Sequence, residues 1–464
     1  MAMTEVTHLT QNLSSTRFLS ANLEFPYIVA DSGMGKIQMN HGSHIFYKLV
    51  AGDPVSVLTM AVSIVGSATQ VLHAIHEKKY WAAQILLVKE REKYSQESHE
   101  RAAIQSIIDT VFGFIGDQIR TSDAPPVHEV EFGTSGWRGV LGDDFTFRNV
   151  LLAAEAIVNV LKRPVVLAAN KVASWEELQA RGCVIGHDNR FMAKEMAELL
   201  AGVMAREGIK IYWIGEASTP EVAAVLRRKG AVFSLNLTPS HNPFTDSGLK
   251  FNPADAGPAG PEFTKPMEAE CRRLMKERPS VHYLNGTDLA SRMVRVDSKE
   301  EYRQMALGFK GISLEWIASQ LTTKSNDDFL LAVDYAHGAA RGRLEHLLGE
   351  RAAQRMVVLR GNDDPLFSGV KPEPNTPRMR QVQDQFRGHP AKQKLFVLVD
   401  ADGDRILLAD GENIVEMNAF GALAAWHLMR TIPEGERRDH VIVRSFGTSR
   451  FVDPILRTLM FPLL

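Results

Sequence analysis

Apolar and polar positions along residues 127–464 follow two patterns that succeed one another repeatedly. Short apolar runs, such as GCVIGHDNR at 182–190 and AVFSLNL at 231–237, predict strands. Between them lie longer stretches, such as 192–208, whose apolar residues recur at helical spacing. Strands that alternate with helices are typical of α/β layers. We therefore expect an α/β fold of consecutive three-layer domains with mixed, mostly parallel sheets.

The first part of the chain has a different pattern. Residues 82–119 carry apolar positions at helical spacing and predict one or two amphipathic helices. The prolines of DAPP at 123–126 end a helix and indicate a boundary. We expect residues 1–126 to form a helical N-terminal extension with no assigned chemistry. Three units are expected to follow, at 127–290, 291–388 and an incomplete 389–464.

Composition and charge exclude few classes of protein. The 464 residues are 45% hydrophobic and 23% charged, as in ordinary soluble globular proteins, and a net charge of -2 does not indicate a nucleic-acid or membrane partner. The least polar window, 55–75, is interrupted by polar residues, which favours a buried helix over a membrane span. No secretory signal is visible, and two distant cysteines, Cys183 and Cys271, fit a reducing compartment. We expect a cytoplasmic protein.

An acidic loop follows the apolar run LFVLV at 395–399. Asp400, Asp402 and Asp404 alternate there, and three carboxylates so close repel one another unless a cation neutralises them. Oxygen ligands suit Mg²⁺, whereas a solvated acidic turn is the other interpretation. Arg405 and Gly411 occupy the positions where a calcium-binding EF-hand loop needs glycine and glutamate. A haloacid-dehalogenase-type phosphatase, with Asp400 as nucleophile, remains an alternative.

Two further loops carry polar groups next to predicted strands. In TPSHNPFTDSGLKF at 238–251, Ser240 follows a strand, and Lys250 comes ten residues later. In EFGTSGWRGVLGDDF at 131–145, glycines permit close approach to a ligand, and Arg138 offers a charge suited to phosphate. Taken singly, each loop is also typical of an ordinary turn.

The combination of these loops is specific for one protein family, although each loop alone is not. The chain resembles the α-D-phosphohexomutase superfamily, the phosphoglucomutases and phosphomannomutases, in FGTSGWRG (132–139), TPSHNP (238–243), GLKF (248–251) and DADGDR (400–405), which occur in the family's order. GHDNR at 186–190 and the proline-rich segment 364–377 support the resemblance, which covers roughly residues 127–454. Within GHDNR, we expect Asp188 and Arg190 to form a structural ion pair.

The resemblance implies a reaction and a set of site residues. A phosphoryl group on Ser240 and the three aspartates would hold one Mg²⁺, and hexose 1-phosphate would be converted to hexose 6-phosphate through a hexose 1,6-bisphosphate. Glucose is the favoured sugar and mannose the next. We expect other cations near Lys250 to shift its pKa. By resemblance the catalytic residues are Ser240, Lys250, Arg138 and His241, and the residues that bind substrate or phosphate are Thr134, Ser135, Asn242 and Arg405.

The sequence departs from the family pattern near its end. A sugar-recognition loop with a Gly-Glu-x-x-Gly pattern and a fourth domain with a phosphate-binding loop do not occur before Leu464. The apolar ending LMFPLL resembles a truncation. A second hypothesis is therefore a catalytically impaired member that acts as a binding or interaction protein. The sequence leaves the oligomeric state open.

Overall fold

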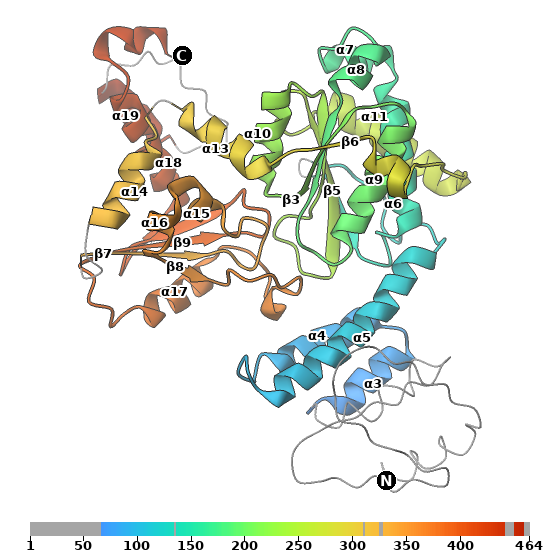
Figure 1. Cartoon of the computed structure of the whole chain (residues 1–464), viewed down its shortest axis with the longest axis horizontal. Coiled ribbons are helices and arrows are strands. Elements are labelled where there is room, and N and C mark those ends of the chain that lie inside the picture. Colours follow the sequence, from blue (N-terminus) through green and yellow to red (C-terminus); the bar gives the residue numbers. More distant parts are fainter. Residues whose placement is uncertain (1–65, 134–135, 310, 324–327, 441–449, 459–464) are drawn as a thin grey trace, which may run out of the picture. The chain divides into compact units, whose positions relative to one another are not determined.

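The computed structural model describes residues 66–133, 136–309, 311–323, 328–440 and 450–458 (Figure 1). The chain divides into two compact units, Met1–Arg120 and Thr121–Leu464. Most of the apolar window at 55–75 lies outside the described residues. The same holds for most of HVIVRS at 440–445, whose apolar run predicts a strand. Within the described ranges, no helix combines the length and the apolar character needed to cross a membrane.

The described part of the first unit is helical, as predicted. Its helices are α3 (Ala68–His76), α4 (Tyr80–Arg91) and α5 (His99–Thr121). Leu87 of α4 and Ile108 of α5 are fully buried. Gln84 Nε2 donates to Ile108 O across 2.9 Å, which satisfies a polar side chain between the two helices. The segment 82–119 thus forms two helices, and the second ends shortly before the proline pair at 125–126.

The first sheet of the second unit is mixed. Its strands, in spatial order, are β1 (Trp137–Val140), β5 (Asp246–Pro253), β4 (Phe233–Leu237), β2 (Cys183–His187), β3 (Ile211–Glu216) and β6 (Met293–Arg295). β2 runs parallel to β3 and β4, and β3 runs parallel to β6. β5 is antiparallel to both β4 and β1. The polar loops expected at the ends of β2 and β4 therefore emerge at the same edge.

Helices cover both faces of this sheet (Figure 1). The helices of this part of the chain are α6 (Phe147–Leu161), α7 (Pro164–Ala169), α8 (Trp175–Arg181), α9 (Ala193–Arg206), α10 (Thr219–Lys229), α11 (Pro261–Glu277), α12 (Gly286–Ala290) and α13 (Ser298–Leu307). On one face, Val222 and Leu226 of α10 pack with Val184 of β2. α10 begins with a capping box between Ser218 and Glu221.

The second sheet is also mixed and carries helices on both faces (Figure 1). Its strands, in spatial order, are β11 (Ile414–Val415), β10 (Ile406–Ala409), β9 (Gln393–Val399), β7 (Phe329–Asp334) and β8 (Met356–Leu359). Its helices and those after it are α14 (Leu314–Thr323), α15 (Arg343–Leu348), α16 (Glu350–Ala353), η2 (Phe367–Gly369), α17 (Thr376–Gln385), α18 (Met417–Arg430), η3 (Glu434–Asp439) and α19 (Val452–Thr458). Successive β7 side chains alternate: Leu331 packs with the α14 layer, and Leu330 with the α17 layer.

The expected fold class is confirmed, and one helix differs from the pattern that its sequence predicts. The segment RGRLEHLLGERAA at 341–353, whose apolar spacing predicts one helix, is split by Gly349, whose φ of 83° is incompatible with a continuous helix. β6 belongs to the first sheet, and in the second sheet β9 pairs in parallel with β7. The proline-rich segment 364–377 leads from β8 into α17, which precedes β9. Because β8 and β9 both run parallel to β7, the connection between them must cross over the sheet.

Candidate active site

Ser240 lies in the loop that follows β4, in a backbone conformation that serine rarely adopts. Its φ is 58°, and its backbone N–H donates to Thr238 Oγ1 at 2.9 Å. Ser240 Oγ donates to Asp400 Oδ2 at 3.3 Å, and it lies 3.2 Å from His241 Nδ1. Although the residue is only 1% exposed, its hydroxyl faces the acidic loop of the second sheet. The fold therefore brings together two loops that lie 160 residues apart.

Arg190 holds the Ser240 loop by its backbone. Its guanidinium donates to Ser240 O at 2.9 Å and to Asn242 O at 2.7 Å, and it also donates to Pro243 O. The predicted ion pair with Asp188 is present at 3.1 Å, and both side chains are buried. Because an arginine presents five donors in a rigid fork, one side chain satisfies several carbonyls of an irregular loop. The pair thus supports the serine as well as the domain.

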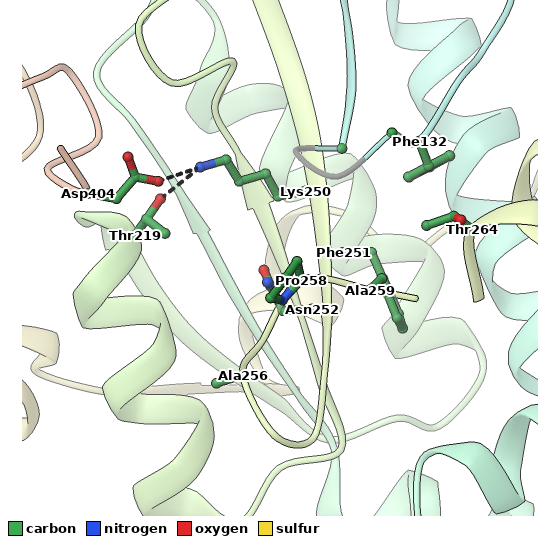
Figure 2. Close-up of a pocket in the computed structure, with 12 residues that line it drawn as sticks. Phe132, Thr219, Lys250, Phe251, Asn252, Ala256, Pro258, Ala259, Thr264 and Asp404 are labelled. Carbon is green, nitrogen blue, oxygen red and sulfur yellow. Dashed lines mark hydrogen bonds and ion pairs between the residues drawn. The ribbon is translucent and has the colours of Figure 1, made fainter. Parts of the chain in front are cut away.

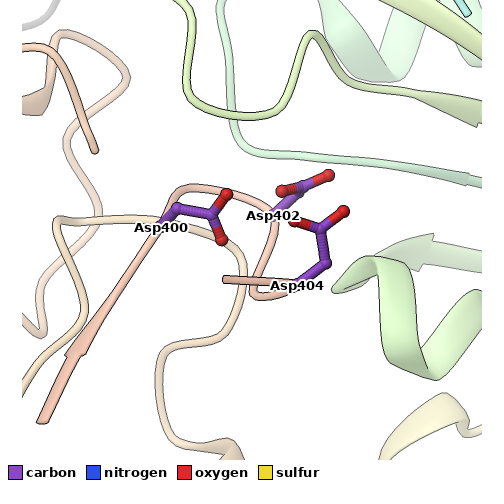
Figure 3. A group of neighbouring side chains, drawn as sticks. All are labelled: Asp400, Asp402 and Asp404. Atoms are coloured by element: carbon purple, nitrogen blue, oxygen red, sulfur yellow. The ribbon is translucent and has the colours of Figure 1, made fainter. Parts of the chain in front are cut away.

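The acidic loop follows β9 as predicted (Figure 3). Oxygen atoms of Asp400, Asp402 and Asp404 all lie within 4.8 Å of one another. Gly403 has a φ of 75°, so the loop turns where a side chain would be strained. Burial, together with the charges of Asp402 and Asp404, raises the pKa of Asp400 to about 8. Three carboxylates in this position therefore resist ionising together unless a cation is near.

Lys250 supplies a positive charge beside these carboxylates (Figure 2). Its Nζ lies 2.6 Å from Asp402 Oδ2 and 3.1 Å from Asp404 Oδ2. Burial alone would lower the pKa of Lys250, but the two carboxylates outweigh burial and raise it. The expectation that neighbouring cations shift this pKa is wrong, because the nearest charges are negative. Lys250 is consequently an ammonium group that can donate a proton.

A cavity of about 230 Å³ opens beside Lys250 (Figure 2). Phe132 and Thr264 line its far side, and Asp404 and Thr219 lie next to the lysine. Gly136, in the glycine-rich loop, has a φ of 83°, and a Cβ there would lie 2.4 Å from Leu249 O. Glycine at this position thus allows the loop to lie directly against the strand that carries Lys250.

Further charged side chains contact Asn242 and His241, the residues that follow Ser240 in its loop. Arg138 Nη1 donates to Asn242 Oδ1 at 3.1 Å, and His241 Nε2 lies 3.4 Å from Arg405 Nη1. Glu373 Oε1, from the proline-rich segment, lies 3.8 Å from His241 Nε2. Burial, followed by the charge of Arg405, lowers the pKa of both His241 and Arg138. An anion such as phosphate would relieve this clustering of positive charge.

The structure joins most of the predicted site residues in one network. Its members are Ser240, His241, Asn242, Lys250, Arg138, Arg405 and the three aspartates, connected by the contacts above, by Arg190 and by the 4.0 Å approach of Arg405 Nε to Asp404 Oδ1. Thr134 and Ser135 lie outside the described residues. Sequence reasoning missed Thr219, Glu373 and the loop contacts of Arg190. Of these, only Thr219 carried a signal, since it lies just beyond the carboxyl end of β3.

The donor set fits a magnesium ion. All the candidate ligand atoms are oxygens, which Mg²⁺ prefers. In addition, Asp402 Oδ1 is buried and has no hydrogen-bond partner among the described residues, which leaves an acceptor in need of a cation or donor. Burial and the neighbouring carboxylates, which together raise the pKa of Asp400, also favour a bound cation at this position.

Comparison with known proteins assigns a family to most of residues 129–413. A model of the α/β/α domain I of phosphoglucomutase/phosphomannomutase matches residues 129–278, and a model of domain II matches residues 313–413. Together the two matches cover more than half of the chain. The expected resemblance is therefore confirmed by both domain models.

Individual relatives are distant. A phosphoglucosamine mutase of Bartonella tribocorum is 25% identical over 64% of this chain and 60% of its own length. Phosphoglucomutase 1 of Drosophila melanogaster is 26% identical over 63% of this chain and 55% of its own length. A crystal structure of a provisionally named phosphomannomutase from Thermus thermophilus has a TM-score of 0.55 and 27% identity, covering 72% of this chain and 68% of that one. The chain thus spans 55–60% of the length of these curated relatives.

Proposed function

Since the chain belongs to the phosphoglucomutase/phosphomannomutase family, we propose that it interconverts hexose 1-phosphates and hexose 6-phosphates through a phosphoserine at Ser240. The contact of Ser240 Oγ with Asp400 at 3.3 Å carries the proposal, because a serine hydroxyl beside a carboxylate cluster suited to a cation can serve as a nucleophile. Glucose phosphate is the first choice of substrate and mannose phosphate the second. The similarity to a phosphoglucosamine mutase adds aminosugar phosphates to the substrates worth testing.

The reaction consists of two phosphoryl transfers. In the first, a sugar hydroxyl oxygen attacks the phosphorus carried by Ser240; the new bond to the sugar forms, and the bond to Ser240 Oγ breaks. The hydroxyl proton leaves the sugar, and Ser240 Oγ takes up a proton. In the second, Ser240 Oγ loses its proton and attacks the other phosphorus of the resulting hexose 1,6-bisphosphate. The new bond to Ser240 Oγ forms, the bond from that phosphorus to the sugar oxygen breaks, and the sugar oxygen takes up a proton. The net change moves phosphate between C1 and C6 of the sugar.

The site residues have distinct roles in this scheme. Lys250, held as an ammonium by Asp402 and Asp404, donates a proton to the oxygen that leaves phosphorus and takes one back in the reverse direction. Arg138 stabilises charge on the transferring group, because a guanidinium is too weak an acid to exchange protons at neutral pH. His241, 3.2 Å from Ser240 Oγ, assists proton transfer or contacts the sugar phosphate.

Asp400, Asp402 and Asp404, with the phosphate on Ser240, would hold one Mg²⁺. When bound, Mg²⁺ supplies positive charge that stabilises the transferring phosphoryl group. We further propose a cytoplasmic setting, because Cys183 and Cys271 are both buried free thiols, as a reducing compartment allows.

The proposal is tested by a direct conversion assay. The purified chain is incubated with Mg²⁺, a trace of glucose 1,6-bisphosphate and, in parallel, glucose 1-phosphate, mannose 1-phosphate or glucosamine 1-phosphate. We expect the corresponding 6-phosphate from at least one sugar, and no conversion by Ser240→Ala. If no sugar is converted and Ser240 takes up no phosphate, the proposal is wrong.

Two other outcomes support the alternative functions. Phosphate on Ser240 without turnover would favour a catalytically impaired family member that binds sugar phosphate or a partner. Phosphate release that survives Ser240→Ala and is lost in Asp400→Asn would favour a phosphatase with Asp400 as nucleophile.

A further inference from the structure

Thr219 lies where three segments of the site meet. It is the first residue of α10, and its Oγ1 donates to Asp402 Oδ2 at 2.7 Å. Its backbone N–H donates to Asp402 O, also at 2.7 Å. Lys250 Nζ donates to Thr219 Oγ1 at 3.3 Å, and Asn236 Nδ2 donates to the same oxygen at 3.2 Å. One hydroxyl therefore connects the helix, the β4–β5 pair and the acidic loop.

The chemistry of a hydroxyl fixes the direction of these bonds. A threonine hydroxyl has one proton to donate and two lone pairs that accept. The ammonium of Lys250 and the amide nitrogen of Asn236 are donors only, so they occupy both lone pairs. The hydroxyl proton must then point at Asp402 Oδ2, which has no proton to offer when ionised. Asn236 and Lys250 are direct partners in the β4–β5 register, so the strand pair sets the two donors side by side.

We propose that Thr219 is a positioning residue that sets the place of the Lys250 ammonium and the orientation of the Asp402 carboxylate. The inference rests on the function proposed above, in which Lys250 moves a proton. Without the hydroxyl, Lys250 keeps its two carboxylates but loses the neutral acceptor that fixes it between them. Since small displacements of a catalytic group slow reactions strongly, the proton transfer should suffer more than sugar binding.

The first test separates turnover from binding. Thr219→Val keeps the branched shape and removes the hydroxyl, Thr219→Ser keeps the hydroxyl, and Thr322→Val on α14 is the matched control. We expect Thr219→Val to lower kcat roughly tenfold or more, the factor that a hydrogen bond to a charged group contributes. KM should change little, Thr219→Ser should restore most of kcat, and Thr322→Val should leave it unchanged. Equal kcat in the parent and Thr219→Val, or a Thr219→Ser as slow as Thr219→Val, would overturn the inference.

A second measurement needs no activity. Lysine acetylation by acetic anhydride is followed by mass spectrometry, with the exposed Lys194 as internal reference. Lys250 should react several-fold faster relative to Lys194 in Thr219→Val than in the parent or in Thr219→Ser. Unchanged relative reactivity would contradict the positioning role. A parent chain that converts no sugar but shows this change in reactivity would overturn the proposed function and leave the positioning of Lys250 supported.

Discussion

At the scale of single residues, the site depends on a serine held in an unfavourable backbone conformation. A left-handed φ costs a non-glycine residue about 1 kcal/mol or more, and it persists only where the surroundings determine it. At Ser240 the surroundings are the hydrogen bond to Thr238 Oγ1 and the carbonyl contacts of Arg190. The hydrogen bonds of the buried Arg190 to the loop carbonyls thus help to maintain the conformation in which the Ser240 hydroxyl faces Asp400.

Arg190→Lys tests this support. A lysine keeps the charge but cannot reach the carbonyls of Ser240, Asn242 and Pro243 at once, so buried acceptors are left without donors. We expect the free energy of unfolding, from urea denaturation, to fall by about 2–4 kcal/mol. Phosphoryl uptake by Ser240 should fall as well.

Arg181→Lys is the matched control. Arg181 is partly exposed, and its guanidinium contacts the Glu177 carboxylate and the carbonyl of Gly230 at the surface. The substitution should therefore cost well under 1 kcal/mol. Equal losses in Arg190→Lys and Arg181→Lys would contradict the proposed support.

At the scale of elements, Asp334 ties the end of β7 to its neighbours. It pairs with Arg360, which follows β8, at 2.7 Å, and with Arg378 of α17, also at 2.7 Å. Burial alone would raise the pKa of Asp334, but Arg360 and Arg378 outweigh burial and lower it. These two ion pairs join the end of β7 to the residue that follows the neighbouring strand β8 and to one covering helix.

A lowered pKa in the folded state makes this contribution depend on pH. The stabilisation is complete above the unfolded-state value of about 4 and declines as pH falls from there towards the folded-state pKa. We expect Asp334→Asn to lower the free energy of unfolding by about 3 kcal/mol at pH 7. The difference from the parent should stay constant between pH 7 and pH 5 and shrink below about pH 4. A difference that does not depend on pH down to pH 3 would show that the charge of Asp334 contributes nothing.

Local patterns in the sequence predicted most of the elements but not all of their breaks. The sequence around α10 contains a signal for each helix end. Ser218 is the N-cap, and Gly230, with a φ of 62°, is the C-cap. The break at Gly349 was missed because a glycine inside an amphipathic pattern is often tolerated in a continuous helix. The acidic loop was predictable for a different reason. Three carboxylates within five residues repel one another in any fold, so their negative charge must be neutralised by a cation or by solvent.

At the scale of the whole second unit, the site forms where the loops of two sheets meet. Thr219 and Ser240 donate hydrogen bonds to Asp402 and Asp400, respectively. Arg343 of α15 forms an ion pair with the buried Glu221 of α10 at 2.9 Å. No local pattern encodes such contacts, because the partners lie more than 100 residues apart. The positioning role of Thr219 and the loop contacts of Arg190 therefore became visible only in the structure, whereas Ser240 and Lys250 were identified by motifs.

The central claim is that Ser240 accepts a phosphoryl group beside the three aspartates. The measurement that tests it most directly is the mass of the Ser240 peptide after the chain has been incubated with glucose 1,6-bisphosphate and Mg²⁺. We predict a phosphate on Ser240 in the parent chain, none in Ser240→Ala, and strongly reduced uptake in Asp402→Asn. An unmodified Ser240 peptide, or a phosphate found on Asp400 instead, would contradict the account.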